Sequence, residues 1–378
     1  MKILGIESSC DETAAAIVEE VGDAARPWVI RSSVVASQVE IHREWGGVVP
    51  ELASRQHVRD ICGVVERALD EAGIALSGLD AVAVTQGPGL VGSLLVGLSF
   101  AKSLAASIDR PLVPVHHLAG HIESLFLHNG PLPLPAAILV VSGGHTSLYL
   151  VPEPGRYHLI GRTRDDAAGE AYDKVAKLLG LGYPGGPIID RLARTGDDRA
   201  VGFPSTRITH RDRNAPNLPG RFDFSFSGIK TAVLRHVRER TGTADSRQRT
   251  ADSRQRTADS APGSSAAASV STPFSEREIA DICASFQRTV VEVLVDRLFE
   301  AAWRHRAKSV GIAGGVSANS RLRQDAVRRG EQLGLPVYLP TLALSTDNAA
   351  MIAAAGLRRY ALGVRAGLDL NADASLAL

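Results

Sequence analysis

Two stretches of the chain share one plan: an apolar strand, a short polar turn and a second apolar strand. They are residues 2–20, KILGIESSCDETAAAIVEE, and residues 136–154, AAILVVSGGHTSLYLVPEP. Apolar runs separated by Gly, Ser and Asp are typical of β-hairpins. A buried strand, a Gly-rich turn and a helix follow in matching order, at 79–107 and at 308–330. The repeat predicts a duplicated α/β lobe with a cleft between the copies, the alternative being chance likeness within an α/β protein.

Size and charge limit the kind of partner. At 378 residues the chain can form two domains that each bury their own core. The formal net charge is +1, so a nucleic-acid partner would need a local basic patch. The densest basic stretch is residues 205–221, which contains Arg207, Arg211, Arg213 and Arg221.

The cysteines and the N-terminus indicate the compartment. Cys10, Cys62 and Cys283 are odd in number and form no C-x-x-C, which favours a reducing cytosol over a disulfide framework. The N-terminus turns polar too early for a signal peptide, and no apolar run approaches the ~20 residues that cross a bilayer. We therefore expect a cytoplasmic protein without a membrane partner.

A repeat interrupts the second half of the chain between residues 241 and 273. The heptad TADSRQR occurs twice and begins a third time, without an apolar face, and Ser, Ala, Pro and Gly follow. Such a composition cannot offset its conformational entropy by burial. We expect residues 243–272 to be a disordered insertion between two helices, with an Arg-bearing RNA tether as the alternative.

Four turns rich in Gly and hydroxyl residues follow predicted strands. They lie at 7–13 (ESSCDET), 86–93 (QGPGLVGS), 141–147 (VSGGHTS) and 313–320 (AGGVSANS). Exposed backbone N–H groups in such turns can hold a phosphate, although a tight turn is the simpler reading of each one. Four of them, paired across a duplicated fold, predict a nucleotide-binding cleft.

Acidic residues accompany the helix predicted after residue 164. Asp166 fits the N-cap of that helix. Asp173 is either a ribose-hydroxyl acceptor or part of a solvated helix face. The GYPGGP turn that follows contains Gly186 and lets the backbone approach a ligand.

A histidine pair suggests a metal site. His117 and His121 in PVHHLAGHIES are four residues apart and share one helix face, although a surface helix can carry such a pair with no metal. Asp347 in LSTDNAAM is either a helix N-cap or a third ligand. Two histidines and one carboxylate suit Fe(II) or Zn(II).

The histidine spacing does not favour a zinc protease. An H-E-x-x-H site needs a Glu directly after the first histidine as general base, and here Leu118 follows His117. Glu123 lies about 200° around the helix from His121. No side chain within the motif can therefore activate a metal-bound water.

The ordered motifs together resemble a known enzyme family. From residue 1 to about 362, apart from the insertion, the chain closely resembles the bacterial TsaD type of tRNA N6-adenosine threonylcarbamoyltransferase. The motifs that carry the resemblance are GIESSCDET, GGVVPELASRQHV, QGPGLVGSLLVG, PVHHLAGH, VSGGHT, DDAAGEAYDKVAKLLGLGYPGGP, FSFSGIKTAV, GGVSANSRLR and STDNAAMIAAAG.

The resemblance implies a fold and its division into lobes. The expected fold is that of actin, hexokinase and Hsp70, an α/β fold with two duplicated RNase H-like lobes around a nucleotide cleft. We expect an N-terminal lobe at 1–133 and a C-terminal lobe at 134–347, with the C-terminal helix in 348–378 able to pack back on the first lobe.

The resemblance also implies site residues. The metal ligands would be His117, His121 and Asp347, holding one divalent ion per subunit, Fe(II) or else Zn(II). Asp11 and Glu12 would be the acids associated with activity. The adenylate would contact Val140, Val141, Ser142, Gly143, Gly144, Asp173, Gly186, Asp190 and Asn319. Asp190 is the least secure of these positions, since some relatives lack an acid there.

The implied reaction transfers a threonylcarbamoyl group from threonylcarbamoyl-AMP to N6 of the adenosine 3′-adjacent to the anticodon, in tRNAs reading ANN codons. The implied partners are tRNA, a TsaB-like paralogue and a TsaE-like ATPase. The alternatives are an ATPase or kinase of the same superfold, a metalloprotease and an inactive scaffold. Against a kinase, Glu7 stands where those enzymes usually place an Asp; against a scaffold, all three metal-ligand positions are kept.

Overall fold

The computed structural model describes residues 1–205, 208, 220–241 and 274–378. The predicted insertion at 243–272 lies outside the described residues, as do Arg207, Arg211 and Arg213 of the predicted basic patch. Arg221 is described, and its side chain is paired with Glu300.

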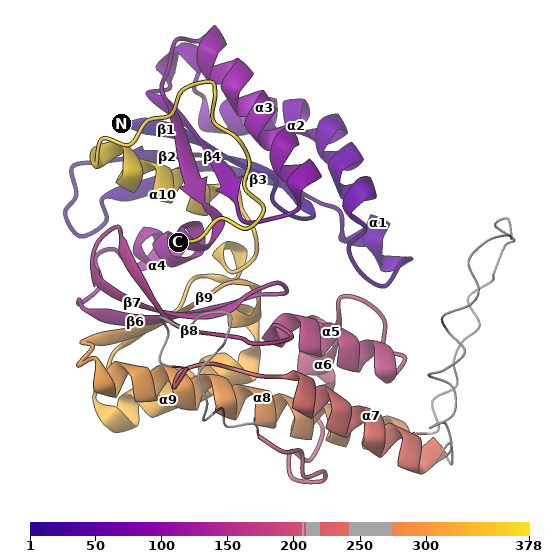
Figure 1. The fold of residues 1–378 in the computed structure, drawn as a ribbon. Helices are drawn as coiled ribbons and strands as arrows, with labels where there is room; N and C mark the ends of the chain where they lie inside the picture. The colour runs from indigo at the N-terminus through magenta and orange to yellow at the C-terminus, as the bar shows by residue number, and fades with distance from the viewer. Residues whose placement is uncertain (206–207, 209–219, 242–273) are drawn as a thin grey trace, which may run out of the picture.

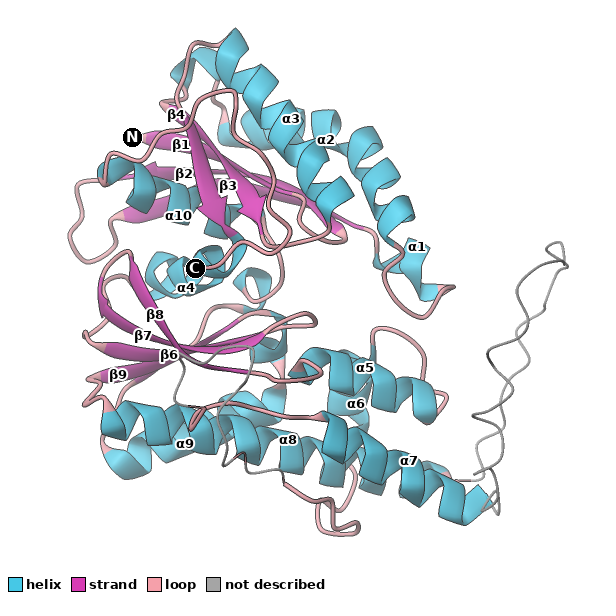
Figure 2. Ribbon diagram, viewed as in Figure 1, coloured by secondary structure: helices cyan, strands magenta, loops and turns pink. Residues whose placement is uncertain are grey.

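Two mixed sheets with the same strand order organise the chain (Figures 1 and 2). The first has the order β3-β2-β1-β4-β5, and the second, read in the equivalent direction, has the order β8-β7-β6-β9-β10. The first sheet contains β1 (Lys2–Glu7), β2 (Glu12–Glu20), β3 (Trp28–Ser37), β4 (Ala81–Gly87) and β5 (Leu112–His116). The second contains β6 (Ala136–Val141), β7 (Thr146–Glu153), β8 (Arg156–Arg162), β9 (Ser309–Ala313) and β10 (Val337–Tyr338).

The pairing within the sheets matches as well. β1 pairs antiparallel with β2 and parallel with β4, and β6 pairs antiparallel with β7 and parallel with β9. Both predicted hairpins and both strand–turn–helix units are confirmed. The duplicated α/β fold class is also confirmed, because strand order and strand direction agree between the copies.

Helices cover the outer face of each sheet and fill the space between the sheets (Figure 2). The N-terminal side carries α1 (Val39–Arg43), α2 (Pro50–Ala72) and α3 (Val91–Ser107). The C-terminal side carries α5 (Ala168–Leu178), α6 (Gly185–Ala193), α7 (Ser227–Thr241), α8 (Glu276–Arg304) and α9 (Ser320–Leu333). Between the sheets lie α4 (His117–Asn129) and α10 (Ala349–Ala361). Short 3-10 turns occur at Leu76–Gly78, Gly315–Ala318 and Leu342–Leu344.

The middle layer joins the two sheets into one apolar core. α10 packs against β1, β2, β4 and α4, while α4 also contacts β6 and β9. The side of α10 toward β1 consists of small residues, and a Cβ added at Gly5 would lie 2.3 Å from the Ala349 carbonyl oxygen. This close approach explains why glycine and alanine face one another here.

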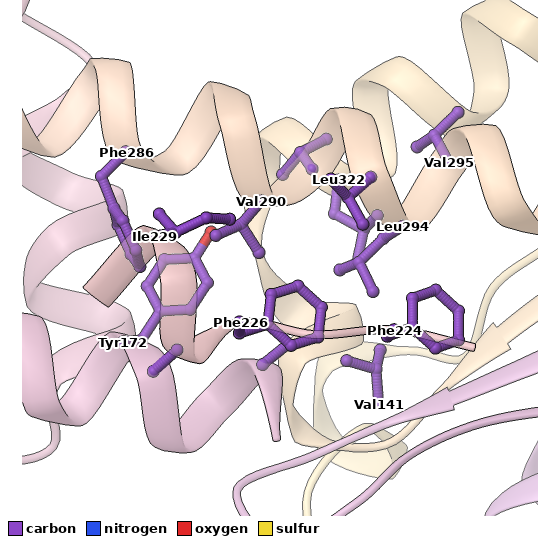
Figure 3. Close-up of a cluster of buried hydrophobic side chains, with 14 of the residues drawn as sticks. Val141, Tyr172, Phe224, Phe226, Ile229, Phe286, Val290, Leu294, Val295 and Leu322 are labelled. Carbon is purple, nitrogen blue, oxygen red and sulfur yellow. The ribbon is translucent and has the colours of Figure 1, made fainter. Parts of the chain in front are cut away.

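The second copy has its own core beneath its sheet (Figure 3). Aromatic side chains of α5, α8 and the segment before α7 meet there, including Tyr172, Phe226 and Phe286, which are fully buried. This core fixes the positions of α5 and α6, and with them Asp173 on α5 and Gly186 on α6.

One local prediction and two of the alternatives drawn from the sequence are wrong. The histidine pair does not lie on a surface helix, because α4 is buried from His117 to Leu127. Asp166 is not an N-cap: α5 begins after Ala167, and Asp166 instead binds Lys174 and Lys230. The N-cap reading of Asp347 also fails, because Asn348 caps α10 by accepting from the Met351 N–H.

Candidate metal and nucleotide site

Three predicted metal ligands converge at the junction of α4 and α10. Asp347 Oδ1 lies 3.1 Å from Nε2 of His121 and 3.5 Å from Nε2 of His117. The imidazole centroids are 4.8 Å apart at 82°. One ligand atom from each of the three residues lies within 4.8 Å of the others. The group could therefore hold a metal ion.

Local structure explains this convergence. Strand β5 ends at His116, whose Nδ1 accepts from the Leu118 N–H and so starts α4 with His117 in its first turn. Asp347 immediately precedes the N-cap of α10, and α10 packs along α4. Packing of the two helices therefore brings the carboxylate to the histidines.

The hydrogen bonding of His121 indicates that its ring is arranged to bind a metal. His121 is fully buried, yet its Nδ1 has no hydrogen-bond partner among the described residues. Its Nε2 is close to Asp347 but lacks hydrogen-bond alignment. Two imidazole nitrogens and one carboxylate oxygen are a donor set that Fe(II) and Zn(II) accept.

The charged groups of the site shift one another's pKa values. Burial lowers the pKa of His117, but the carboxylates of Asp347 and Glu7 outweigh it and raise this pKa to about 9. Burial raises the pKa of Asp347, while His117 and His121 hold it well below its usual value. In the absence of a metal, the carboxylates thus favour a proton on His117.

Glu7 is the site residue that sequence reasoning missed. Its buried carboxylate accepts from the Ser9 N–H at 2.6 Å, from Thr85 Oγ1 at 2.9 Å and from His117 Nδ1 at 2.9 Å. A proton held on Nδ1 leaves Nε2 of His117 free for a metal. The available signal was an acidic residue at the end of a predicted buried strand, directly followed by Ser8 and Ser9. In the sequence this residue argued only against a kinase.

A second acidic group lies in the turn between β1 and β2. Asp11 is buried, and burial together with the Asp11 charge raises the pKa of Glu12 well above its usual value. Buried His57, on α2, has its Nε2 2.9 Å from the Cys10 carbonyl oxygen. This contact ties the acidic turn to α2, and neither Cys10 nor His57 was predicted from the sequence to be a site residue.

The VSGGH turn contributes backbone rather than side chains. Val140 and Val141 are fully buried in the core, so only their main chain could reach a ligand. A Cβ added at Gly143 or Gly144 would meet nothing within 4 Å. The turn is closed by Ser142, whose N–H donates to the His145 carbonyl oxygen at 2.8 Å. An open, glycine-lined turn of this kind suits a phosphate.

His145, in the same turn, was also missed. Burial, followed by the positive charges of His117 and His121, lowers its pKa to about 4. The helix that carries His117 and His121, α4, packs against β6, the strand that leads into this turn, so the turn and the candidate metal site lie on neighbouring elements.

Among the remaining predicted ligand positions, Asp173, Asp190 and Asn319 make hydrogen bonds within the protein. Asp173 Oδ1 accepts from the Gly185 N–H at 2.7 Å at the start of α6, and a Cβ at Gly186 would meet nothing within 4 Å. Asp190 accepts from Ser320 Oγ at 2.8 Å, and Asn319 caps α9. Gln287 bonds to both Asp190 and Asn319, so these two predicted positions are neighbours in one polar junction.

A family model described as TsaD, tRNA N6-adenosine threonylcarbamoyltransferase, matches residues 29–354. The chain belongs to this family. Enzymes of that name from Koribacter versatilis and Symbiobacterium thermophilum are 50% and 49% identical to it. Those matches cover 100% of the chain in both cases, and 98% and 96% of the relatives.

A solved structure shows the same fold. Full-length HypF in its phosphate- and nucleotide-bound form matches with a TM-score of 0.55 at 13% identity, over 97% of this chain and 47% of that protein. The fold class predicted from the motifs is confirmed.

Membership of the TsaD family makes the chain a transferase in tRNA modification, so the kinase, protease and scaffold alternatives are set aside. The position of Glu123 agrees: its carboxylate is fully buried, binds Arg358 at 2.9 Å and the Tyr157 hydroxyl at 2.6 Å, and does not belong to the group formed by His117, His121 and Asp347. Among the described residues of this TsaD-family chain, no helix is long and apolar enough to cross a membrane.

Proposed function

We propose that this chain transfers the threonylcarbamoyl group of threonylcarbamoyl-AMP to N6 of the adenosine 3′-adjacent to the anticodon in tRNAs reading ANN codons. The carrying observation is that two histidines and a carboxylate converge at α4, which packs against β6, the strand that leads into an open glycine turn. Such a site can hold both the acyl and the phosphate portions of a mixed anhydride.

His117, His121 and Asp347 would hold one divalent metal, with Fe(II) as the first candidate and Zn(II) as the alternative. A bound metal supplies a Lewis acid that orients and polarises oxygens of the acyl donor. Glu7 would fix the His117 ring by accepting the Nδ1 proton at 2.9 Å. A neutral, oriented imidazole binds a metal better than one that is protonated or free to rotate.

The adenylate would lie along the second copy of the fold. Main-chain groups from Val140 to Gly144 would bind the phosphate, which supports its departure as AMP. Asp173 would accept from the ribose, with Gly186 allowing close approach. Asn319 and Asp190 would complete the nucleotide side from the α6–α9 junction.

Transfer requires one bond to form and one to break. The N6 amine attacks the carbamoyl carbon, the bond from that carbon to the phosphate oxygen breaks, and the amine proton is lost. Glu12, with Asp11 beside it, would accept this proton, because its raised pKa makes the carboxylate a stronger base.

The partner proteins and the lobes are part of the same proposal. A TsaB-like paralogue would dock on α2 and α3, where Val58, Val91 and Leu95 are exposed, and a TsaE-like ATPase would act on that assembly. We propose that the N-terminal lobe ends at residue 133 and that the C-terminal lobe begins at residue 134. We also propose that the protein acts in the cytoplasm, where tRNA and ATP are available.

Reconstitution tests the proposal. Protein, partners, threonine, bicarbonate, ATP, an adenylate-forming enzyme and unmodified tRNA should yield threonylcarbamoyl-adenosine by mass spectrometry. We expect His117→Ala, His121→Ala and Asp347→Ala to lose bound metal and transfer together, because two ligands retain a metal poorly. The matched control is His128→Ala in the last turn of the same helix. Full metal content and transfer rate in His117→Ala would refute the metal assignment.

A further inference from the structure

A hollow between α1 and the α5–α6 turn takes no part in the function described so far. Its volume is about 360 Å³, within the ~300–1,000 Å³ range of small-ligand sites. Figure 1 shows α1 on the N-terminal side facing the α5–α6 region across the space between the two copies. The hollow is lined by Arg43, Leu181, Gly182, Tyr183, Pro184, Pro187, Ile188 and Arg191.

The lining combines flat apolar surface with positive charge. Tyr183, Pro184 and Pro187 offer an aromatic ring and two proline rings. Arg43 comes from one copy of the fold and Arg191 from the other, so cations stand on both sides of the hollow. The only ion pair recorded for Arg43 among the described residues is with exposed Glu40 on the same short helix. Rings together with guanidinium groups are the surface on which unpaired nucleobases stack.

The hollow adjoins the proposed reaction centre through Tyr183. Burial, and then the negative charges of Asp11 and Asp173, raise the pKa of this tyrosine. Tyr183 also directly precedes Pro184, the N-cap of α6, whose first residue Gly185 is bound by Asp173. A base in the hollow would therefore lie next to an adenosine presented to the acids.

We propose that this hollow binds an unpaired nucleobase of the tRNA anticodon loop, adjacent to the adenosine that is modified. The inference rests on the proposed function, since it takes tRNA as the substrate. RNA loops are read through bases that are turned out of the stack onto aromatic rings and arginines. Tyr183 provides the stacking surface, and Arg43 and Arg191 neutralise the flanking phosphates.

Kinetics with substituted enzyme test the stacking. With the partners present, Tyr183→Leu should raise KM for tRNA about tenfold, while metal content, Tm and KM for threonylcarbamoyl-AMP stay at wild-type values. Tyr183→Phe should restore most of the loss, because the ring is what stacks. A Tyr183→Leu enzyme with wild-type KM for tRNA would overturn the proposal.

A direct probe separates this inference from the proposed function. An anticodon stem-loop carrying 2-aminopurine beside the target adenosine should lose fluorescence on binding wild-type protein but not Tyr183→Leu. Arg43→Ala should weaken stem-loop binding and lower its salt dependence. The control is Arg67→Ala, an exposed helical arginine of the same copy that also pairs with a local acid. If wild-type protein transfers the group but does not quench the probe, nucleobase binding in the hollow is refuted and the proposed function stands. If no transfer occurs, both the proposed function and nucleobase binding in the hollow are refuted.

Discussion

Glu7 sits behind one proposed metal ligand and makes three hydrogen bonds within the first copy of the fold. Removing it should leave His117 Nδ1, Thr85 and the Ser9 N–H without their shared acceptor. We expect Glu7→Ala to weaken metal affinity about 10–100-fold, the usual effect of losing a carboxylate behind a ligating histidine. Competition of Zn(II) against a chelator measures this.

The isosteric variant and a remote control sharpen the test. Glu7→Gln keeps one oxygen that can accept from His117 and should lie between wild type and Glu7→Ala. Glu19→Gln, near the C-terminal end of β2 and paired with Arg31, should bind metal as wild type does. Wild-type metal affinity in Glu7→Ala would show that the hydrogen bond to His117 has no positioning role.

Asp166 joins two helices of the second copy. It binds Lys174 of α5 at 2.8 Å and Lys230 of α7 at 2.7 Å. Burial raises the pKa of Asp166, but the two ammonium groups outweigh burial and hold it below the usual value of 3.8. Because the pKa is lower in the folded state, the ionised carboxylate of Asp166 stabilises the fold at pH values above 3.8. This stabilisation is lost as the pH falls below 3.8 and through the folded-state pKa.

We therefore expect Asp166→Asn to cost about 1–2 kcal/mol at pH 7, discounted because Lys174 is partly exposed. The difference in Tm from wild type should be a few degrees at pH 7 and should shrink near pH 3. Glu153→Gln, which breaks an exposed pair with Arg156, should change Tm little. An Asp166→Asn difference that is constant with pH would contradict the ion-pair explanation.

At the scale of the whole molecule, the sequence predicts that residues 243–272 are dispensable. α7 ends at Thr241 and α8 begins at Glu276, and an ion pair from Arg240 to Glu278 brings these two ends together. We expect replacement of 243–272 by a short Gly-Ser linker to leave Tm unchanged and transfer within about twofold. A large loss of tRNA affinity would instead support the RNA-tether alternative.

Local patterns in the sequence determined much of the architecture. Alternating apolar runs and glycine turns depend only on neighbouring residues, so both hairpins and both strand–turn–helix units could be predicted from them. The four-residue spacing of His117 and His121 likewise placed both rings on one face, because helix geometry repeats every 3.6 residues. The identity and order of the motifs were sufficient to predict the family.

Tertiary structure alone decided the environment of these residues. Nothing local distinguishes an acid that caps a helix from one that meets a distant partner, which is why Asp166 and Asp347 were open to misreading. Glu7 and His117 are 110 positions apart, and only the packing of β1 beside β4 and β5 brings them together. The burial of α4 and the hollow at Tyr183 depend on how the two copies face each other, which is set by the shared core around α4 and α10.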